Sequence, residues 1–304
     1  MEAKDKLLAL LMVIVWGANF TIIKLGLGGI PSMLLVAVRY LLVFFPAIFF
    51  VKKPASSWKY IIAYGFTVGV GQFSCLFYAL EIGMPAGLAS IIVQLQGFIA
   101  PFLSALFLDE KLSAKQLVGF FVAALGLVLI GLASSSQGVT SIPFSAFLLT
   151  IGAALFWSVS NIISKSASIE AKKEGKQLDM FALVVWSSLI PPLPMFGLSL
   201  LINTPSLIIS SLSTLSLMSV FSVLYLAYAS TLFAYKVWND LISKYPMAKV
   251  SPISLLIPIF ALLVSQLILS EELSKMQWLG VVVILAGLLI SNLTPKKRPS
   301  PPKP

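Results

Sequence analysis

The sequence predicts an all-α membrane protein with ten transmembrane helices, arranged as two inverted five-helix repeats. Three observations lead to this fold class: the composition, the spacing of apolar segments, and a residue pattern that recurs in both halves of the chain. Of the 304 residues, 59% are hydrophobic and only 11% are charged. A soluble domain carries about 25% charged residues, so most of this protein's surface is expected to face lipid.

Ten apolar segments have lengths close to the roughly 20 residues that a helix needs to cross the hydrocarbon core. The expected helices span residues 7–26, 31–51, 60–81, 84–107, 116–133, 145–165, 180–203, 214–237, 248–269 and 276–293. The first is interpreted as a retained helix, because no small-residue cleavage site and soluble domain follow it. Residues 294–304, rich in Pro and Lys, are expected to form a disordered, basic, cytoplasmic tail.

Lysine and arginine gather in alternate gaps between these segments. They occur at the N-terminus, in the even-numbered gaps and in the tail, whereas the odd-numbered gaps hold almost none. Lys and Arg are retained on the cytoplasmic side during insertion, so both termini are expected to face the cytoplasm from the inner (plasma) membrane. The net charge of +10 is thus a topology signal, and the expected partners are membrane lipids and a small molecule, not nucleic acid.

A residue pattern in the first half recurs in the second. The matched residues are Trp16 and Lys24 with Trp157 and Lys165, and the segments 110–119 and 271–280. Because each half would hold five helices, the second copy must enter the membrane from the opposite side. We expect a first repeat at residues 1–138 and a second at residues 139–293, an arrangement typical of carriers that work by alternating access.

The residues also carry a family resemblance. The Trp-Gly-Ala-Asn and Trp-x-x-x-Asn helices, the segment 83–90 and the two Glu-x-Leu-Ser turns resemble the EamA family of the drug/metabolite transporter superfamily. Within that family, residues 83–94 and 187–191 look most like bacterial exporters of O-acetylserine and cysteine. The resemblance implies a secondary transporter with ten helices that exports amino-acid-like metabolites such as cysteine or O-acetylserine.

Other functions fit the residues less well. Nucleotide sugars would need several deep basic residues for their phosphates, and organic cations would need a deep carboxylate; Arg39 alone is deep and charged. An intramembrane enzyme would need a nucleophile–base pair or metal ligands, yet the chain has no His. A channel would need symmetric subunits or charge rings. No P-loop is present, and neither a cofactor nor a metal ion is expected.

Polar side chains within the apolar segments are the candidates for a substrate site, because a polar group in hydrocarbon needs an internal partner or a water-filled cavity. Arg39 is expected to bind the substrate carboxylate through its planar guanidinium, to act as a gate, or to hold carbonyls of a broken helix end. The amides and aromatics that could line the same cavity are Trp16, Asn19, Gln72, Tyr78, Gln94, Trp157 and Asn161. Their alternative role is interhelical hydrogen bonding.

Residues near helix ends suggest how the passage could open. Lys24 and Glu81 are candidates for a gate or a coupling residue, although a facilitated mechanism without proton coupling is equally open. Prolines are expected to interrupt the fourth, seventh and ninth helices, at Pro85, Pro101, Pro191, Pro192, Pro194, Pro252 and Pro258. The Gly65-x-x-x-Gly69 pattern is interpreted as an internal helix contact rather than a dimer seam, so the protein is expected to be a monomer or a weak homodimer.

Overall fold

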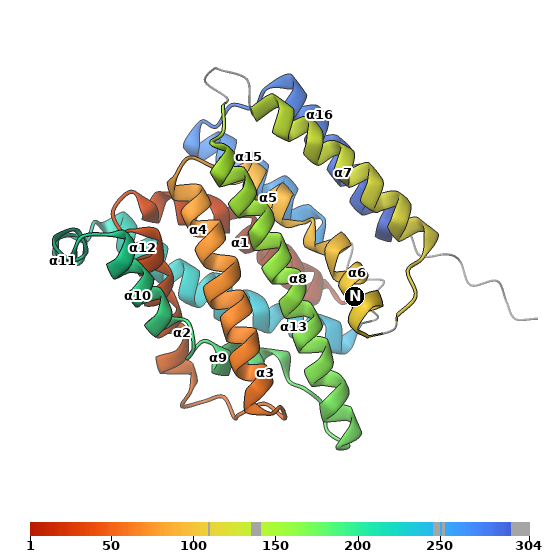
Figure 1. The fold of residues 1–304 in the computed structure, drawn as a ribbon. Helices are drawn as coiled ribbons and strands as arrows, with labels where there is room; N and C mark the ends of the chain where they lie inside the picture. The colour runs from red at the N-terminus through yellow and green to blue at the C-terminus, as the bar shows by residue number, and fades with distance from the viewer. Residues whose placement is uncertain (109, 135–140, 246–249, 251–252, 293–304) are drawn as a thin grey trace, which may run out of the picture.

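The protein is helical throughout the part that the computed structural model describes, namely residues 1–108, 110–134, 141–245, 250 and 253–292 (Figure 1). No strand occurs among these residues, and the all-α prediction is confirmed. The predicted tail at residues 294–304, the expected repeat boundary at residue 138, and Pro252 lie outside the described residues.

In the first half of the chain, the helices follow the predicted apolar segments. Their bounds are α1 Ala3–Leu27, α2 Ser32–Ala47, α3 Trp58–Tyr64, η1 Gly65–Gln72, α4 Phe73–Glu81, α5 Ala86–Val93, α6 Gln96–Phe107 and α7 Ala114–Ser134. Segment η1 is a π-helix joined end to end with α3 and α4, so residues 58–81 form one continuous helix. Short π-helical segments are rare and are frequent at functional sites.

The second half also follows the predicted segments. Its helices are α8 Phe144–Lys173, α9 Met180–Ser187, α10 Pro192–Ile202, α11 Pro205–Ser213, α12 Leu217–Leu224, η2 Tyr225–Phe233, α13 Ala234–Lys244, α15 Leu256–Leu269 and α16 Lys275–Asn292. A second π-helix, η2, joins α12 to α13. Two features were not predicted: α8 continues past residue 165 to Lys173, and α11 occupies the expected loop between residues 203 and 214.

Six of the described helical segments are long and apolar enough to cross a membrane: Ala3–Leu27, Trp58–Glu81, Ala86–Phe107, Ala114–Ala133, Phe144–Lys173 and Leu217–Ile242. A seventh crossing results if α9 and α10, bent by 44° at their junction, form one span. Three shorter apolar helices accompany them: Ser32–Ala47, Leu256–Leu269 and Lys275–Ser291. Large apolar side chains such as Leu201 and Leu217 are 83% and 88% exposed, as expected for a multi-pass protein whose surface faces lipid.

The helix breaks do not all lie where the prolines predict them. Helices α5 and α6 meet in a tight turn at residues 94–95, closed by i→i−3 hydrogen bonds. Pro85 instead precedes α5 as its N-cap and Pro101 lies inside α6, so the positions expected for the break in the fourth helix were wrong. The predicted ninth helix is interrupted by a turn at Leu255, and Pro258 lies in the first turn of α15 just after it. A proline at a helix start costs no hydrogen bond, because the first amides have no intrahelical partner anyway. The break between α9 and α10, at residues 188–191, agrees with the prediction.

The two halves pack against each other reciprocally. Helix α1 of the first half lies against α12, α13 and α15 of the second, while α8 of the second half lies against α3, α4 and α6 of the first. Helix α2 packs on α10, and α7 packs along α16 as a pair at the edge of the molecule (Figure 1). Helices α1 and α8 therefore have corresponding neighbours, each in the opposite half of the chain. Helices α7 and α16 correspond to each other in the same way.

Glycines allow the backbones of α7 and α16 to pack in direct contact. A Cβ atom added to Gly119 would lie 2.7 Å from the carbonyl oxygen of Gly287, and one added to Gly126 would lie 2.7 Å from the carbonyl oxygen of Gly280. Small residues permit this kind of close approach between helices in a membrane. An alanine at any of these positions would force the two helices apart.

Candidate functional site

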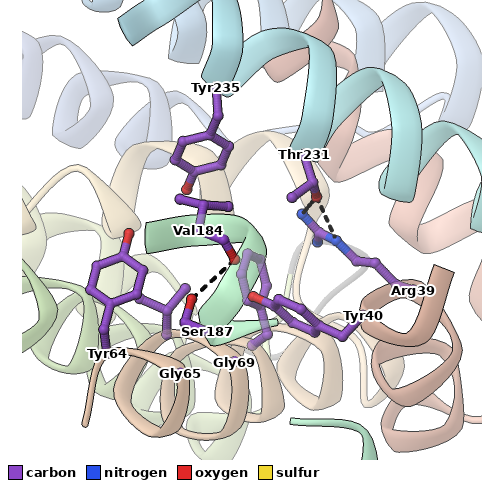
Figure 2. Close-up of a pocket in the computed structure, with 11 residues that line it drawn as sticks. Arg39, Tyr40, Tyr64, Gly65, Gly69, Val184, Ser187, Thr231 and Tyr235 are labelled. Carbon is purple, nitrogen blue, oxygen red and sulfur yellow. Dashed lines mark hydrogen bonds between the residues drawn. The ribbon is translucent and has the colours of Figure 1, made fainter. Parts of the chain in front are cut away.

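A narrow cavity lies beside Arg39, between helices of both halves (Figure 2). Its lining residues are Arg39, Tyr40, Tyr64, Gly65, Val68, Gly69, Phe73, Val184, Ser187, Thr231 and Tyr235. The cavity volume is about 10 Å³, which is room for about one water molecule. A metabolite can therefore occupy this place only after the surrounding helices move apart.

The Arg39 side chain is hydrogen-bonded along one edge and buried without a partner at its Nη1 atom. It is only 2% exposed. Its Nε and Nη2 atoms donate hydrogen bonds to Oγ1 of Thr231, at 3.2 and 2.9 Å. The guanidinium lies over the ring of Phe73, with 4.4 Å between Cζ and the ring centroid. Among the described residues, Nη1 has no hydrogen-bond partner and the guanidinium has no ion-pair partner.

The unpaired edge of Arg39 is the feature that points to a ligand. An arginine in the middle of a membrane helix costs about 2.5–3.5 kcal/mol on insertion scales, and a buried donor without a partner costs about 1–3 kcal/mol more. The contact with Phe73 returns only about 0.5–2 kcal/mol. The protein therefore maintains an incompletely paired cation whose remaining donors suit a carboxylate, which guanidinium binds through two parallel hydrogen bonds.

The π-helix η2 sets the orientation of Thr231. The hydroxyl of this residue donates a 2.8 Å hydrogen bond to the carbonyl of Leu226, five residues earlier. With its hydrogen engaged there, the oxygen presents its lone pairs to Arg39. The π-helical geometry thus fixes the residue that holds the arginine.

The π-helix η1 forms the opposite wall through close backbone contact. A Cβ atom added to Gly65 would lie 2.6 Å from the carbonyl oxygen of Ser187, and one added to Gly69 would lie 1.9 Å from Cγ of Pro191. These glycines pack against the broken α9–α10 helix of the same chain. This is the internal contact that the sequence predicted for them.

Two of the predicted amide side chains form hydrogen bonds between helices. Asn19 in α1 accepts a 2.7 Å hydrogen bond from the hydroxyl of Ser230, and Trp16 donates to the Ser230 carbonyl at 3.0 Å. In the other half, Asn161 in α8 donates a 2.8 Å hydrogen bond to the side chain of Gln96 in α6. Each bond joins two helices, which is the alternative role that the sequence left open for these residues.

The remaining predicted substrate-site residues are buried or partly buried. Gln72 is buried, and its Oε1 atom has no partner within the described part of the chain. Tyr78, Gln94 and Trp157 are partly buried. Of all the predicted substrate-site residues, each of which is described, Arg39 is the one that lines the cavity.

Lys24 and Glu81 each take part in contacts between helices at one end of the bundle, here called the Lys24 end. Lys24 forms a 2.9 Å ion pair with Glu271, whose carboxylate also accepts the backbone N–H groups of residues 86–87 at 2.7 and 3.0 Å. Glu81 accepts hydrogen bonds from the backbone N–H and the hydroxyl of Ser32, at 3.1 and 2.6 Å. The Glu271 contacts thus join α1 to α5 and to the segment before α16, and the Glu81 contacts join α4 to α2.

The pair formed by the corresponding residues of the recurring pattern lies at the opposite end, here called the Lys165 end. Lys165 forms an ion pair with Glu110, and these side chains are 40% and 49% exposed. The span Ala86–Phe107 begins at the Glu271 carboxylate and ends just before Glu110. A helix of this length extends roughly 30 Å, so the two ion pairs are separated by about the thickness of the hydrocarbon core.

Comparison with known proteins decides the family. The sequence profile of the EamA-like transporter family matches residues 5–132 and 144–293, nearly the whole chain. The chain belongs to the EamA family. The membership that the sequence predicted is confirmed, and the chain is a multi-pass membrane transporter rather than an enzyme.

Relatives of this EamA protein match along its whole length. A protein of Salmonella typhimurium described as a probable amino-acid metabolite efflux pump is 42% identical, covering 96% of this chain and 95% of that protein. One of Escherichia coli with the same description is 40% identical over the same shares. A probable terminal-alkyne amino-acid exporter of Streptantibioticus cattleyicolor is 23% identical, covering 93% and 91%.

A solved crystal structure shares the fold of this EamA protein. It superposes with a TM-score of 0.62 over 96% of this chain and 97% of that chain, at 15% sequence identity. At this identity the likeness concerns the fold alone.

The sequence did not single out several residues around Arg39: Tyr40, Tyr64, Thr231 and Tyr235. Tyrosine and threonine are ordinary in apolar helices, so nothing distinguished them from packing residues. The pairing of Lys24 with Glu271 carried a signal, because each residue has a counterpart in the other half of the chain: Lys165 for Lys24, and Glu110 for Glu271.

Proposed function

We propose that this chain exports small amino-acid-like metabolites, such as cysteine or O-acetylserine, from the cytoplasm across the inner membrane by alternating access. The two relatives described as amino-acid metabolite efflux pumps support the substrate class, because they match nearly the whole chain at 42% and 40% identity. The narrow closed cavity supports the mechanism, since a substrate at Arg39 requires the helices to open on one side and then on the other.

The proposed architecture is ten transmembrane helices in two inverted repeats, residues 1–138 and 139–293. It counts α9–α10 as one span and the three shorter apolar helices as further spans. The two ranges matched by the family profile, 5–132 and 144–293, support the division, and so does the reciprocal packing of α1 and α8. The alternation of Lys and Arg supports both termini on the cytoplasmic side.

The observation that carries the proposal is the buried, incompletely paired guanidinium of Arg39. A zwitterion that leaves water gives up strong solvation of its carboxylate, and the carrier must replace it with fixed donors. Arg39 supplies a permanent charge and free N–H groups at a cavity lined from both halves. Binding at such an interface lets each half open in turn without losing the site.

The other candidate residues are proposed to shape the route on either side of Arg39. Gln72, with its unpaired Oε1, offers an acceptor inside the bundle. Asn19 and Asn161 join neighbouring helices at related places, where a change in those contacts would accompany opening. The remaining members of the proposed route are Trp16, Tyr78, Gln94 and Trp157.

Lys24 and Glu81 are proposed to act in the outer gate. The ion pair of Lys24 with Glu271 joins α1 to the start of α5, and Glu81 joins α4 to the start of α2. With the termini in the cytoplasm, this end faces outward. These contacts would have to separate before a substrate could leave.

Transport of cysteine and cysteinamide into inside-out vesicles tests the proposal. Arg39→Gln should lower cysteine uptake by at least about tenfold, because a hydrogen bond to a charged group is worth roughly 1.5–3 kcal/mol. It should spare cysteinamide comparatively, since the amide has no carboxylate. Arg39→Lys should have an intermediate effect, because lysine keeps the charge but lacks the planar fork.

The matched control is Lys236→Gln, which removes an exposed cation on α13 outside the cavity and should change neither uptake. All rates are divided by the amount of folded protein, measured by size-exclusion chromatography. Equal proportional losses for the acid and the amide would leave Arg39 with a structural role only. Wild-type protein that moves neither compound, but moves an organic cation or a nucleotide sugar, would overturn the substrate class.

A further inference from the structure

The cavity beside Arg39 has a second polar side. Tyr64 and Tyr235 line it from α3 and α13, and Ser187 lines it from α9 (Figure 2). Figure 2 shows their oxygen atoms around the space on the side of the cavity away from the guanidinium. Tyr40 lies nearer to the arginine, with its ring centroid 5.7 Å from Cζ of Arg39.

The cavity has a donor side, where the polar atoms can only donate, and an acceptor side, where they can accept. On the donor side, Nη1 of Arg39 can only donate. On the other side, the Ser187 hydroxyl already donates to the carbonyl of Val184, at 3.0 Å, so its oxygen can only accept from a ligand. The hydroxyls of Tyr64 and Tyr235 have no partner among the described residues, so they can accept from a ligand and can also donate.

This division matches the two ends of a zwitterion. A carboxylate needs donors, which Arg39 supplies, whereas an ammonium group needs acceptors or the faces of aromatic rings. Hydroxyl oxygens and tyrosine rings supply both at the acceptor side. No carboxylate is among the residues that line the cavity, so these neutral groups are the available partners for an ammonium there.

We propose that Tyr64, Ser187 and Tyr235 form the ammonium-binding half of the Arg39 site and make the carrier selective for zwitterionic amino acids over carboxylates without an ammonium group. This inference rests on the proposed export function. It adds a specificity element that comes from three helices and both halves of the chain. Tyr64 belongs to the first half, and Ser187 and Tyr235 belong to the second.

The test compares cysteine with 3-mercaptopropionate, which has the same thiol and carboxylate but lacks the ammonium group. Uptake of each into proteoliposomes is measured for the wild type, Tyr64→Phe, Tyr235→Phe and Ser187→Ala. Each compound is also tested as an inhibitor of labelled cysteine uptake, which reports binding of a compound that is carried slowly. Each variant should lower cysteine uptake by about tenfold while the result for 3-mercaptopropionate stays within about twofold.

The control is Tyr228→Phe, which removes a hydroxyl from an exposed side chain of η2 outside the cavity and should leave the ratio of the two compounds unchanged. A tyrosine or serine that only supports folding would lower both compounds alike, so a constant ratio in the three variants overturns the inference. Unchanged uptake of both compounds overturns it too.

Different results would contradict the export function and the ammonium-binding role. Wild-type protein that carries no cysteine contradicts the export function, and the inference falls with it. Wild-type protein that carries cysteine, and loses it in Arg39→Gln, with a constant ratio in the tyrosine and serine variants, contradicts the ammonium half alone.

Discussion

The Lys24 end and the Lys165 end carry the same pair of residues in different surroundings. At the Lys24 end, the Glu271 side chain is 9% exposed and binds a lysine and two backbone N–H groups. At the Lys165 end, the Glu110 side chain is 49% exposed, and the described residues offer its carboxylate only Lys165. One sequence pattern thus produces a buried network at one end and a solvated ion pair at the other.

The difference indicates how one chain can present two states. A buried pair with extra hydrogen bonds is costly to break, whereas exposed pairs typically contribute less than about 1 kcal/mol. In the conformation described here, the ion pair at the Lys24 end is therefore held more firmly than the ion pair at the Lys165 end. If the halves exchange roles during transport, the network would form at the Lys165 end when the Lys24 end opens.

The largest expected effect concerns which side of the membrane each end of the helix bundle faces. In a Cys75→Ala background, a cysteine at Asn203, in the loop at the Lys24 end, should react with an impermeant maleimide added to intact cells. A cysteine at Glu174, in the loop at the Lys165 end, should react only after the membrane is permeabilised. The reverse pattern would invert the orientation, and the Lys24 network would then close the cytoplasmic side.

The next largest effect should come from neutralising one acid of each pair. Glu271→Gln leaves Lys24 without its counter-ion and weakens the contacts with residues 86–87, at an expected cost of about 2 kcal/mol, since Lys24 is partly exposed. Glu110→Gln should cost less than about 1 kcal/mol. Thermal unfolding in detergent and cysteine export should both show the larger loss for Glu271→Gln.

Charge reversal sharpens the same comparison. The double variant Lys165→Glu with Glu110→Lys should export cysteine as well as the wild type does, because each of these two side chains needs only an opposite charge as its partner. Exchanging Lys24 with Glu271 should not, because a lysine at position 271 cannot accept the N–H groups at the start of α5. Equal rescue at both ends would show that the backbone contacts of Glu271 add nothing.

The smallest effect is expected for Glu81→Gln and Asp179→Asn. Glutamine can still accept from Ser32, and asparagine is nearly as good as aspartate at the start of α9, where Asp179 accepts from the N–H groups of residues 181 and 182. Each variant should retain most of its transport, measured with and without a pH gradient. Abolished transport at normal protein levels would identify that acid as a proton-coupling site.

The sequence alone predicted the course of the chain well, because hydropathy and charge report directly on the membrane. The helix positions follow from runs of apolar residues, and Arg39 stood out because arginine is rare in such runs. The positions of the helix breaks were harder to predict. The turn at residues 94–95 contains no proline, and the π-helices η1 and η2 depend on tertiary packing that a single sequence does not reveal.

The site was only partly predictable for a related physical reason. Asn19 and Asn161 have the polarity of substrate contacts, but whether an amide meets a ligand or a neighbouring helix depends on its partner, and here the partners are Ser230 and Gln96. Tyr64 and Tyr235 carried no signal, since an aromatic side chain in an apolar segment is equally suited to packing and to lining a cavity. Their position beside Arg39 follows from the fold.

The close pairing of α7 and α16 has a practical consequence for measuring motion in this protein. Because glycine backbones touch at two levels, the two helices are expected to move as one rigid strut. A pair of spin labels with one on each helix would then give a distance that stays constant through the transport cycle. Labels on the strut and on α8 would report displacement of the bundle against that internal reference.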